Sequence, residues 1–109
     1  MIKLHKLDLI LLLKTFSDCT IDNPFSNKDL VVARHKSNKK WFALIINYNG
    51  NLAINLKCEP MKSDFLRSIH SGVIPAWHMN KIHWNTVIIN KITTNELTEM
   101  ICDSYELTK

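Results

Sequence analysis

The feature that most constrains the fold is the segment Trp41–Ile46, in which every residue is apolar. Successive side chains of a strand point to opposite faces, so a strand over Lys40–Asn47 that is apolar on both faces is predicted to lie inside a sheet. Two more β-rich runs flank it, Leu30–Lys36 and Asn51–Leu56. The pair Asn49-Gly50 between the second and third runs is the strongest short signal for a hairpin. An antiparallel sheet is therefore expected.

Three helices and two further short strands are predicted around these runs, from apolar periodicity, a proline that suits a first helical turn and a capping-box match at Thr93 and Glu96. The helices are expected over Leu4–Phe16, Pro60–Gly72 and the segment from Thr93 onward. The strands are expected over Val73–Trp77 and about His83–Asn90. The predicted fold class is α+β: a two-layer sandwich with an antiparallel sheet, in α-β-β-β-α-β-β-α order. One domain over residues 1–109 is expected, because two independent halves would each be marginal.

Periodicity also predicts which side chains are buried. The apolar helical faces are expected to consist of Leu4, Leu7, Leu11, Leu12 and Phe16, then Met61, Phe65, Leu66 and Ile69, and finally Leu97, Met100, Ile101 and Leu107. A single core is expected to contain Trp41, Phe42, Leu44, Ile54, Phe65 and Trp84. The strand Asn51–Leu56 is expected to be half-exposed, with Ala53 and Asn55 on the exposed side. The stretch Cys19–Asp29 is expected to be a loop, with Pro24 and Phe25 packing back on the body.

Positive charge is concentrated in the first part of the chain. Residues 1–91 carry 13 basic and 6 acidic side chains, a net charge of +7, whereas residues 92–109 carry one basic and four acidic side chains, a net charge of −3. A basic body favours polyanionic partners, although most small basic proteins are simply soluble.

Cysteine usage and the first residues of the chain bear on the compartment. Cys19, Cys58 and Cys102 are an odd number at long spacings with no CxxC pair, which favours a reducing cytoplasm over a disulfide framework. The apolar run Leu9–Leu13 is too short to span a bilayer, and Asp8 lies in what would be the apolar region of a signal peptide. No membrane contact is expected.

The first candidate site is the connection between the first two β-rich runs. It contains four permanent cations, Arg34, Lys36, Lys39 and Lys40, in a strand-turn-strand segment. Charges at a hairpin tip can reach phosphates as a wing does, and phosphate contacts supply most non-specific affinity for nucleic acid. The alternative is a solvated turn whose lysines keep a sheet edge soluble.

The second candidate site lies around the connector between the last two strands. Its members can donate hydrogen bonds to phosphates or base edges, and they are Lys57, His78, Asn80, Lys81 and His83. Trp77 and Trp84 lie beside them, and aromatic rings between cations suit single-stranded nucleic acid because bases stack on them. The alternative is that both tryptophans belong to the core and that His78 and Asn80 only cap a turn.

No catalytic site, metal site or cofactor is expected. The histidines and cysteines do not form the close ligand pairs of a tetrahedral metal site. A nucleophilic dyad of Cys58 with His78 or His83 is conceivable, but a thiol at the apolar end of a strand is more commonly buried and inert. Gly50 and Gly72 are the only glycines, which argues against a phosphate-binding loop.

Several clusters occur in order along nearly the whole chain. They are Asn23-Pro24-Phe25, Lys40–Leu44, Asn55–Pro60 (NLKCEP), Pro75–Lys81 with His83-Trp84 (HMNK-x-HW), and Asp103–Leu107 (DSYEL). With these clusters the chain resembles the MmcQ/YjbR family. The resemblance implies a two-layer α/β sandwich of α-β₃-α-β₂-α order. It also implies DNA binding, by analogy with a double-wing DNA-binding domain, while the same architecture is likened to secretion chaperones and frataxin-type proteins.

Two functional hypotheses follow. The first is a nucleic-acid-binding protein, with DNA as the expected ligand, that contacts phosphates through the basic hairpin and the HMNK connector. The second is a protein-interaction or chaperone-like adaptor that binds a protein partner or forms a homodimer. A joined positive face would favour the first hypothesis, and a large contiguous apolar patch would favour the second.

Overall fold

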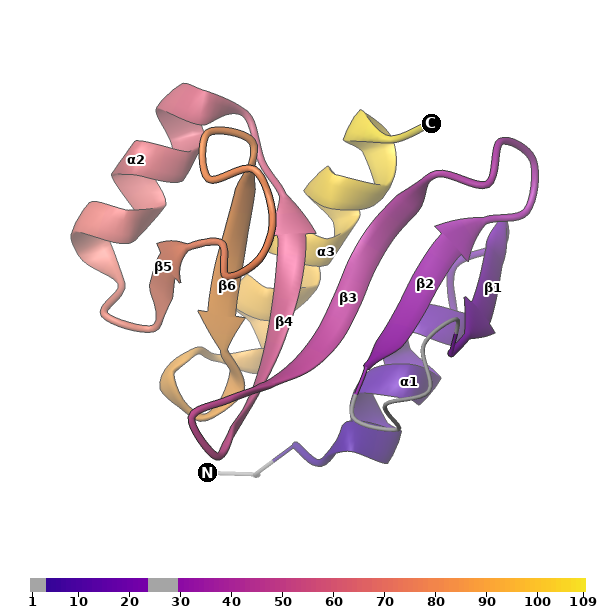
Figure 1. Cartoon of the computed structure of the whole chain (residues 1–109), viewed down its shortest axis with the longest axis horizontal. Helices are drawn as coiled ribbons and strands as arrows, with labels where there is room; N and C mark the ends of the chain where they lie inside the picture. The colour runs from indigo at the N-terminus through magenta and orange to yellow at the C-terminus, as the bar shows by residue number, and fades with distance from the viewer. Residues whose placement is uncertain (1–3, 24–29) are drawn as a thin grey trace.

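A computed structural model describes residues 4–23 and 30–109. Its central element is a six-stranded antiparallel sheet with the strand order β1-β2-β3-β4-β6-β5 (Figure 1). The strands are β1 (Cys19–Asp22), β2 (Val31–His35), β3 (Trp41–Tyr48), β4 (Asn51–Lys57), β5 (Val73–Pro75) and β6 (Trp84–Ile88). The helices are α1 (Lys6–Lys14), α2 (Pro60–Ile69), the short 3₁₀ helix η1 (Ile89–Lys91) and α3 (Thr94–Leu107).

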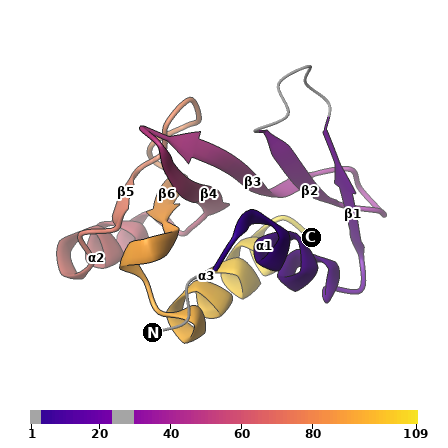
Figure 2. The ribbon, with the colours of Figure 1, turned by 90° about the horizontal axis from the view of Figure 1, so that it is seen from below.

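The helices are distributed unevenly over the sheet. Helices α1 and α3 cover one face, and α2 lies beside β5 at one edge (Figures 1 and 2). The segment between β5 and β6 projects from the opposite face (Figure 2). The predicted α+β class, antiparallel sheet and order of elements are confirmed, and β3 lies inside the sheet as its two apolar faces predicted.

One short strand, β1, lies within the stretch Cys19–Asp29 that was predicted to be a loop. It pairs with β2 from Cys19 opposite His35 to Asp22 opposite Val32. A four-residue strand at a sheet edge has too little apolar alternation to be recognised from its sequence. The predicted packing of Pro24 and Phe25 lies outside the described residues.

Apolar side chains are buried on both faces of the sheet. The larger cluster lies between the sheet and the two covering helices and includes Leu9, Leu13, Phe42, Ile54 and Ile101. The smaller cluster, on the other face, consists of Val32, Leu44, Ile46, Ala53 and Ile88. The expectation of one core was therefore wrong, because Leu44 lies in the smaller cluster, Trp41 and Trp84 are half-buried and Phe65 is 60% exposed.

The face of α1 was predicted only in part, since Leu4, Leu12 and Phe16 pack against the larger cluster as expected. Leu9 and Leu13 are fully buried, whereas Leu7 and Leu11 are more than half exposed. Six of the nine residues of this helix are apolar and its three charged residues lie on different sides, so periodicity cannot choose among its faces.

The apolar stripe of α2 faces outward, contrary to the prediction. Met61, Phe65 and Ile69 are 80%, 60% and 54% exposed, while Leu66 and Ser63 are buried. In α3, the predicted burial of Leu97, Met100 and Ile101 is confirmed, but Leu107 is 47% exposed. Half of the predicted capping box of α3 is present, since the Thr93 hydroxyl oxygen accepts the Glu96 N–H at 3.2 Å, whereas the Glu96 carboxylate accepts the Thr93 hydroxyl at 2.7 Å.

Candidate nucleic-acid interface

The turn between β2 and β3, residues 36–40, is the basic turn, and it is held by backbone and side-chain hydrogen bonds. The carbonyl oxygen of His35 accepts the N–H of Lys39 at 3.0 Å, and the His35 N–H donates to the carbonyl of Lys40 at 2.9 Å. The Asp18 carboxylate accepts the hydroxyl of Ser37 at 2.6 Å and the Ser37 N–H at 3.1 Å. Both bonds stabilise the ionised carboxylate and lower the pKa of Asp18, and the bond from the Ser37 hydroxyl has the larger effect.

The basic turn is also fastened to the end of α3. The Asn38 side chain donates from Nδ2 to the carbonyl of Thr108 at 2.9 Å, and its Oδ1 accepts the N–H of Lys40 at 2.8 Å. The fully buried ring of His35 lies 2.8 Å from the Thr108 hydroxyl oxygen and 3.3 Å from the Asp18 carboxylate. Contacts to two other parts of the chain therefore fix the position of this turn.

Three lysines of the basic turn, Lys36, Lys39 and Lys40, are exposed. Among residues 4–23 and 30–109, no acidic side chain forms an ion pair with any of them. Lys39 has a φ of 64°, a left-handed conformation that is uncommon for a residue other than glycine. The turn thus presents three free positive charges on a rigid support.

Arg34 differs from these lysines. Its guanidinium forms an ion pair with Asp22 at 2.9 Å across β1 and β2, and it lies 6.0 Å from the centre of the Trp41 ring. The side chain is only 24% exposed. The charge of Arg34 is therefore already balanced within the chain.

The connector, residues 76–83 between β5 and β6, is anchored by a closed ring of hydrogen bonds. The Trp77 N–H donates to the Thr86 hydroxyl oxygen at 2.9 Å, and that hydroxyl donates to Asn55 Oδ1 at 2.5 Å. Asn55 Nδ2 completes the ring by donating to the Trp77 carbonyl at 3.1 Å. Asn55 and Thr86 lie opposite each other on β4 and β6, and both are fully buried. The expected exposure of Ala53 and Asn55 was wrong, since both are fully buried and the connector is bonded to Asn55 on that face.

Arg67 of α2 anchors the other end of the connector. Its Nε donates to Asn85 Oδ1 at 2.7 Å, and its terminal nitrogen donates to the carbonyls of Lys81 and Trp84. Ser63, also on α2, donates its hydroxyl to the same Asn85 oxygen at 2.8 Å. No motif pointed to the anchoring roles of Asn55, Thr86 and Arg67. The available signal was a polar side chain inside an otherwise apolar strand.

The polar and aromatic side chains of the connector are of two kinds, those open to solvent and one that caps the turn. Trp77 is 42% exposed, and its ring lies 3.9 Å from that of His78, which has a φ of 64°. Lys81 and His83 are exposed, with no ion pair to a described residue. Asn80 instead caps the turn, because its Oδ1 accepts the N–H of Ile82 at 2.9 Å.

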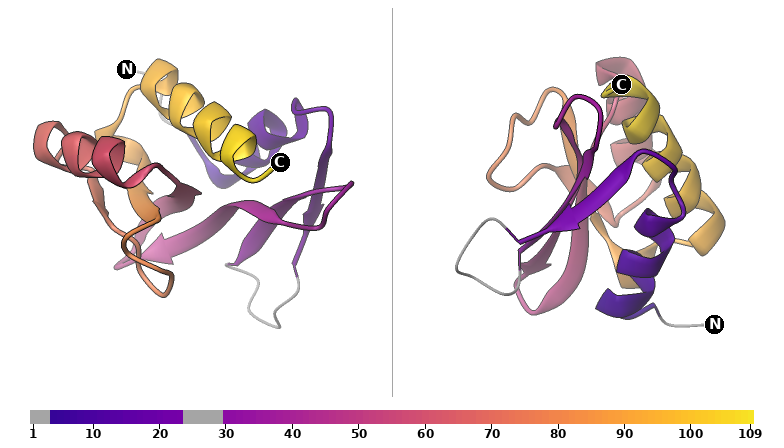
Figure 3. Two further views of the ribbon diagram at one scale, coloured as in Figure 1. Left: turned by 90° about the horizontal axis from the view of Figure 1, so that it is seen from above. Right: turned by 90° about the vertical axis from the view of Figure 1, so that its right-hand side faces the viewer.

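The basic turn and the connector lie at the same end of the sheet, the upper end in Figure 1 and in the right-hand view of Figure 3. The start of β6 is two strand positions from β3, which corresponds to about 10 Å across the sheet. Half-buried Lys57 ends β4 between them. The structure therefore gathers two cationic patches at one end of the sheet without joining them into a continuous surface.

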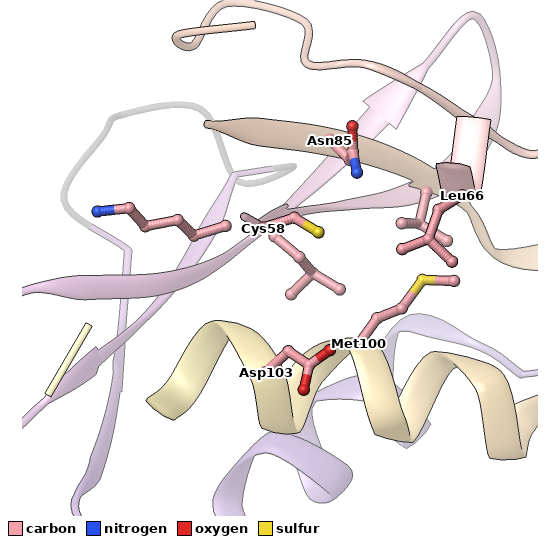
Figure 4. Close-up of a pocket in the computed structure, with 8 residues that line it drawn as sticks. Cys58, Leu66, Asn85, Met100 and Asp103 are labelled. Carbon is pink, nitrogen blue, oxygen red and sulfur yellow. The ribbon is translucent and has the colours of Figure 1, made fainter. Parts of the chain in front are cut away.

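A small cavity lies beside Cys58. Leu66, Met100 and the Cys58 side chain converge on it from α2, α3 and the end of β4 (Figure 4). It has room for about one water molecule. Burial raises the pKa of the Cys58 thiol, so the thiol is protonated at neutral pH, and it bonds to neither His78 nor His83 in the described part of the chain.

Side chains that could bind a metal ion do not cluster in residues 4–23 and 30–109. The histidine, cysteine and acidic side chains of these residues form no group of three that could hold a metal ion. None of the helices described has both the length and the apolar character needed to cross a bilayer.

Comparison with known proteins identifies related sequences. The model of the YjbR family matches residues 14–107. YyaQ of Bacillus subtilis is 38% identical over 87 residues, which cover 70% of this chain and 73% of YyaQ. YjbR of Escherichia coli is 32% identical over 66 residues, 60% of this chain and 56% of YjbR. The matched segment thus spans little more than half of that relative.

Solved structures of similar proteins show the same fold. A crystal structure of a Pseudomonas syringae protein superposes with a TM-score of 0.87 and 33% identity, covering 97% of this chain and 100% of the other. A crystal structure of a Deinococcus radiodurans protein gives a TM-score of 0.80 and 28% identity, covering 92% of this chain and 75% of the other.

Proposed function

The chain belongs to the YjbR family, and we propose that it is a cytoplasmic protein that binds nucleic acid, DNA foremost, without catalysing a reaction. The basic turn carries this proposal. Its three exposed lysines, Lys36, Lys39 and Lys40, have no acidic partner in the described chain, and Asp18 and Asn38 fix the backbone that bears them. A cytoplasmic location agrees with the three free cysteines.

The charges of this turn are better explained by phosphate binding than by a role in keeping a sheet edge soluble. A lysine that only kept a sheet edge soluble would need no fixed backbone, and Lys39 adopts a strained conformation at the tip. A turn that is already fixed loses no further backbone freedom when its lysines meet a phosphate backbone, so only side-chain freedom is lost. The connector, which leads into β6, supplies a second cationic contact through Lys81, with His83 beside it.

Titration of a labelled DNA duplex at several salt concentrations tests this proposal. The logarithm of the affinity should fall with the logarithm of the salt concentration, by about 0.9 per phosphate neutralised. Lys36→Glu and Lys40→Glu should each weaken binding by about tenfold and make the slope shallower by about one.

Lys91→Glu provides the matched control, because Lys91 is equally exposed but lies in η1, away from the basic turn. It changes the net charge by the same amount and should weaken binding much less, through long-range attraction alone. Equal losses in all three variants would mean generic attraction without a site. Absence of wild-type binding at about 50 mM salt would refute the proposal.

The outward stripe of α2 favours a second candidate function, a protein-interaction surface. Met61, Phe65 and Ile69 recur every fourth residue on one side of the helix and are all more than half exposed. Three side chains are too few for a stable interface, which buries about 800 Å² on each partner, so neighbouring surface would have to take part. Phe65→Asp should dissociate any dimer seen by sedimentation. A monomeric wild-type protein would remove the homodimer from consideration.

A further inference from the structure

Trp77 is exposed although it lies next to a heavily bonded part of the chain. The ring of hydrogen bonds through Thr86 and Asn55 holds both the N–H and the carbonyl of Trp77. The two side chains that form it are fully buried, yet the tryptophan ring is 42% exposed. A buried polar pair in an otherwise apolar sheet is destabilising unless it is fully bonded. Here Asn55 and Thr86 bond to the backbone of Trp77, and this backbone positions the Trp77 ring.

Neighbouring rings give Trp77 a defined orientation. The His78 ring lies 3.9 Å from the Trp77 ring, centre to centre, with the planes tilted by 46°. Tyr48 meets Trp77 edge to face at 6.0 Å. His78 adopts its left-handed backbone, φ 64°, in bringing its ring to this place. These contacts leave part of a large aromatic surface open to solvent in a fixed position.

The charges around this surface select the class of ligand. Lys81 and His83 are exposed on the same connector, whereas the lysines of the basic turn precede the start of β3, the strand whose last residue, Tyr48, contacts Trp77. A planar ring among cations fits a planar, uncharged group that belongs to a polyanion. A nucleobase on a phosphate backbone has this character, and only an unpaired base exposes a face for stacking.

We propose that the Trp77–His78 pair is a stacking platform for an unpaired base, so that the nucleic acid bound by this protein is single-stranded where it meets the connector. This inference rests on the proposed function and names its ligand class. The phosphates on either side of the base would lie toward Lys81 and toward the basic turn. Asn55, Thr86 and Arg67 act as positioning residues, because they hold the connector without contacting the ligand.

The test compares a labelled single-stranded oligonucleotide with the duplex made from the same sequence, at one salt concentration. Trp77→Ala should weaken single-strand binding about 5- to 100-fold and duplex binding less than about twofold. Trp77→Phe should restore most of the single-strand affinity, since it keeps a ring. Phe65→Ala is the matched control, because it removes an exposed aromatic ring from α2, and it should change neither affinity.

Fluorescence gives a second readout that does not depend on the alanine variant folding. Stacking on a base should quench tryptophan emission in the wild type, and Trp77→Phe should lose this quenching while still binding. Quenching that persists in Trp77→Phe would overturn the proposal, as would equal losses of single-strand and duplex affinity. Single-strand binding that responds to Lys40→Glu but is unchanged in Trp77→Ala would refute the platform and leave the proposed function standing. No binding of either probe would refute both.

Discussion

Replacing Asn55 by alanine tests how the connector is held, and its effect can be worked out from the structure. The substitution removes the donor to the part-buried Trp77 carbonyl and the acceptor of the buried Thr86 hydroxyl. Leaving a buried polar group unpaired costs about 1–3 kcal/mol, so two groups give about 2–6 kcal/mol. A water molecule in the vacated space would satisfy part of this loss. We therefore expect Asn55→Ala to lower the free energy of unfolding by about 2–4 kcal/mol.

Urea unfolding followed by tryptophan fluorescence measures this loss, provided that the dependence on urea is unchanged. Asn90→Ala is the control, because Asn90 is exposed in η1 and its removal should change stability by less than about 0.5 kcal/mol. A loss below about 1 kcal/mol in Asn55→Ala would refute the closed ring of hydrogen bonds.

A double-mutant cycle separates the ring from simple burial. Thr86→Val removes the hydroxyl that links Trp77 to Asn55 while keeping the shape of the side chain. Because both variants break the same ring, their combined loss should be smaller than the sum by about 0.5–3 kcal/mol. Strict additivity would mean that the two side chains act independently and that the ring does not exist as a unit.

Three further predictions concern stability and reactivity. Leu44→Ala should cost about 2–5 kcal/mol in chemical unfolding, because Leu44 is buried in the smaller cluster, and a loss below about 0.5 kcal/mol would place it at the surface. The pKa of Asp18 is lower in the folded protein than in the unfolded chain, where it is about 3.9. The ionised carboxylate therefore stabilises the fold above about pH 3.9, and this stabilisation is lost as the pH falls through the pKa of the folded protein. The stability gap between wild type and Asp18→Asn should thus shrink below about pH 4, and a gap that widens there would contradict the hydrogen bonds from Ser37. Iodoacetamide should alkylate exposed Cys102 before buried Cys58, and mass spectrometry showing the reverse order would be incompatible with the described core.

The elements that were predicted well have strong local signals. The unbroken apolar run of β3 required burial on both faces, and the structure places that strand inside the sheet. The turn before it was recognised as a cluster of cations, and three of its lysines are exposed and free. Arg34 could not be separated from them, because its partner Asp22 reaches it only through the pairing of β1 with β2, which no local pattern encodes.

The orientation of α1 and α2 depends on long-range packing. The sequence of α1 is apolar almost all round, so several faces satisfy the periodicity equally well. In α2 the periodicity is clear but points the wrong way. Ser63 and Arg67 attach this helix to Asn85 through hydrogen bonds, and its apolar stripe is left outside. A polar attachment of this kind leaves no periodic trace in a sequence.

The backbone supplies an argument that is independent of charge. Among the described residues, Lys39, Asn49 and His78 are the non-glycine residues with positive φ. Asn49 precedes Gly50 in a tight hairpin, where the turn itself favours an Asn-Gly pair.

Lys39 also lies in a hairpin turn, which commonly takes one residue in this conformation, but neither Lys39 nor His78 belongs to an Asn-Gly pair. Glycine or asparagine would adopt the left-handed conformation with less strain, which for other residues is about 1–2 kcal/mol. Both side chains are exposed, so burial does not account for them either. Strain persists only where the surroundings fix the backbone, here through Asn38 beside Lys39 and through the bonds to Trp77 beside His78. The two strained residues lie in the two segments that are proposed to contact phosphate and base.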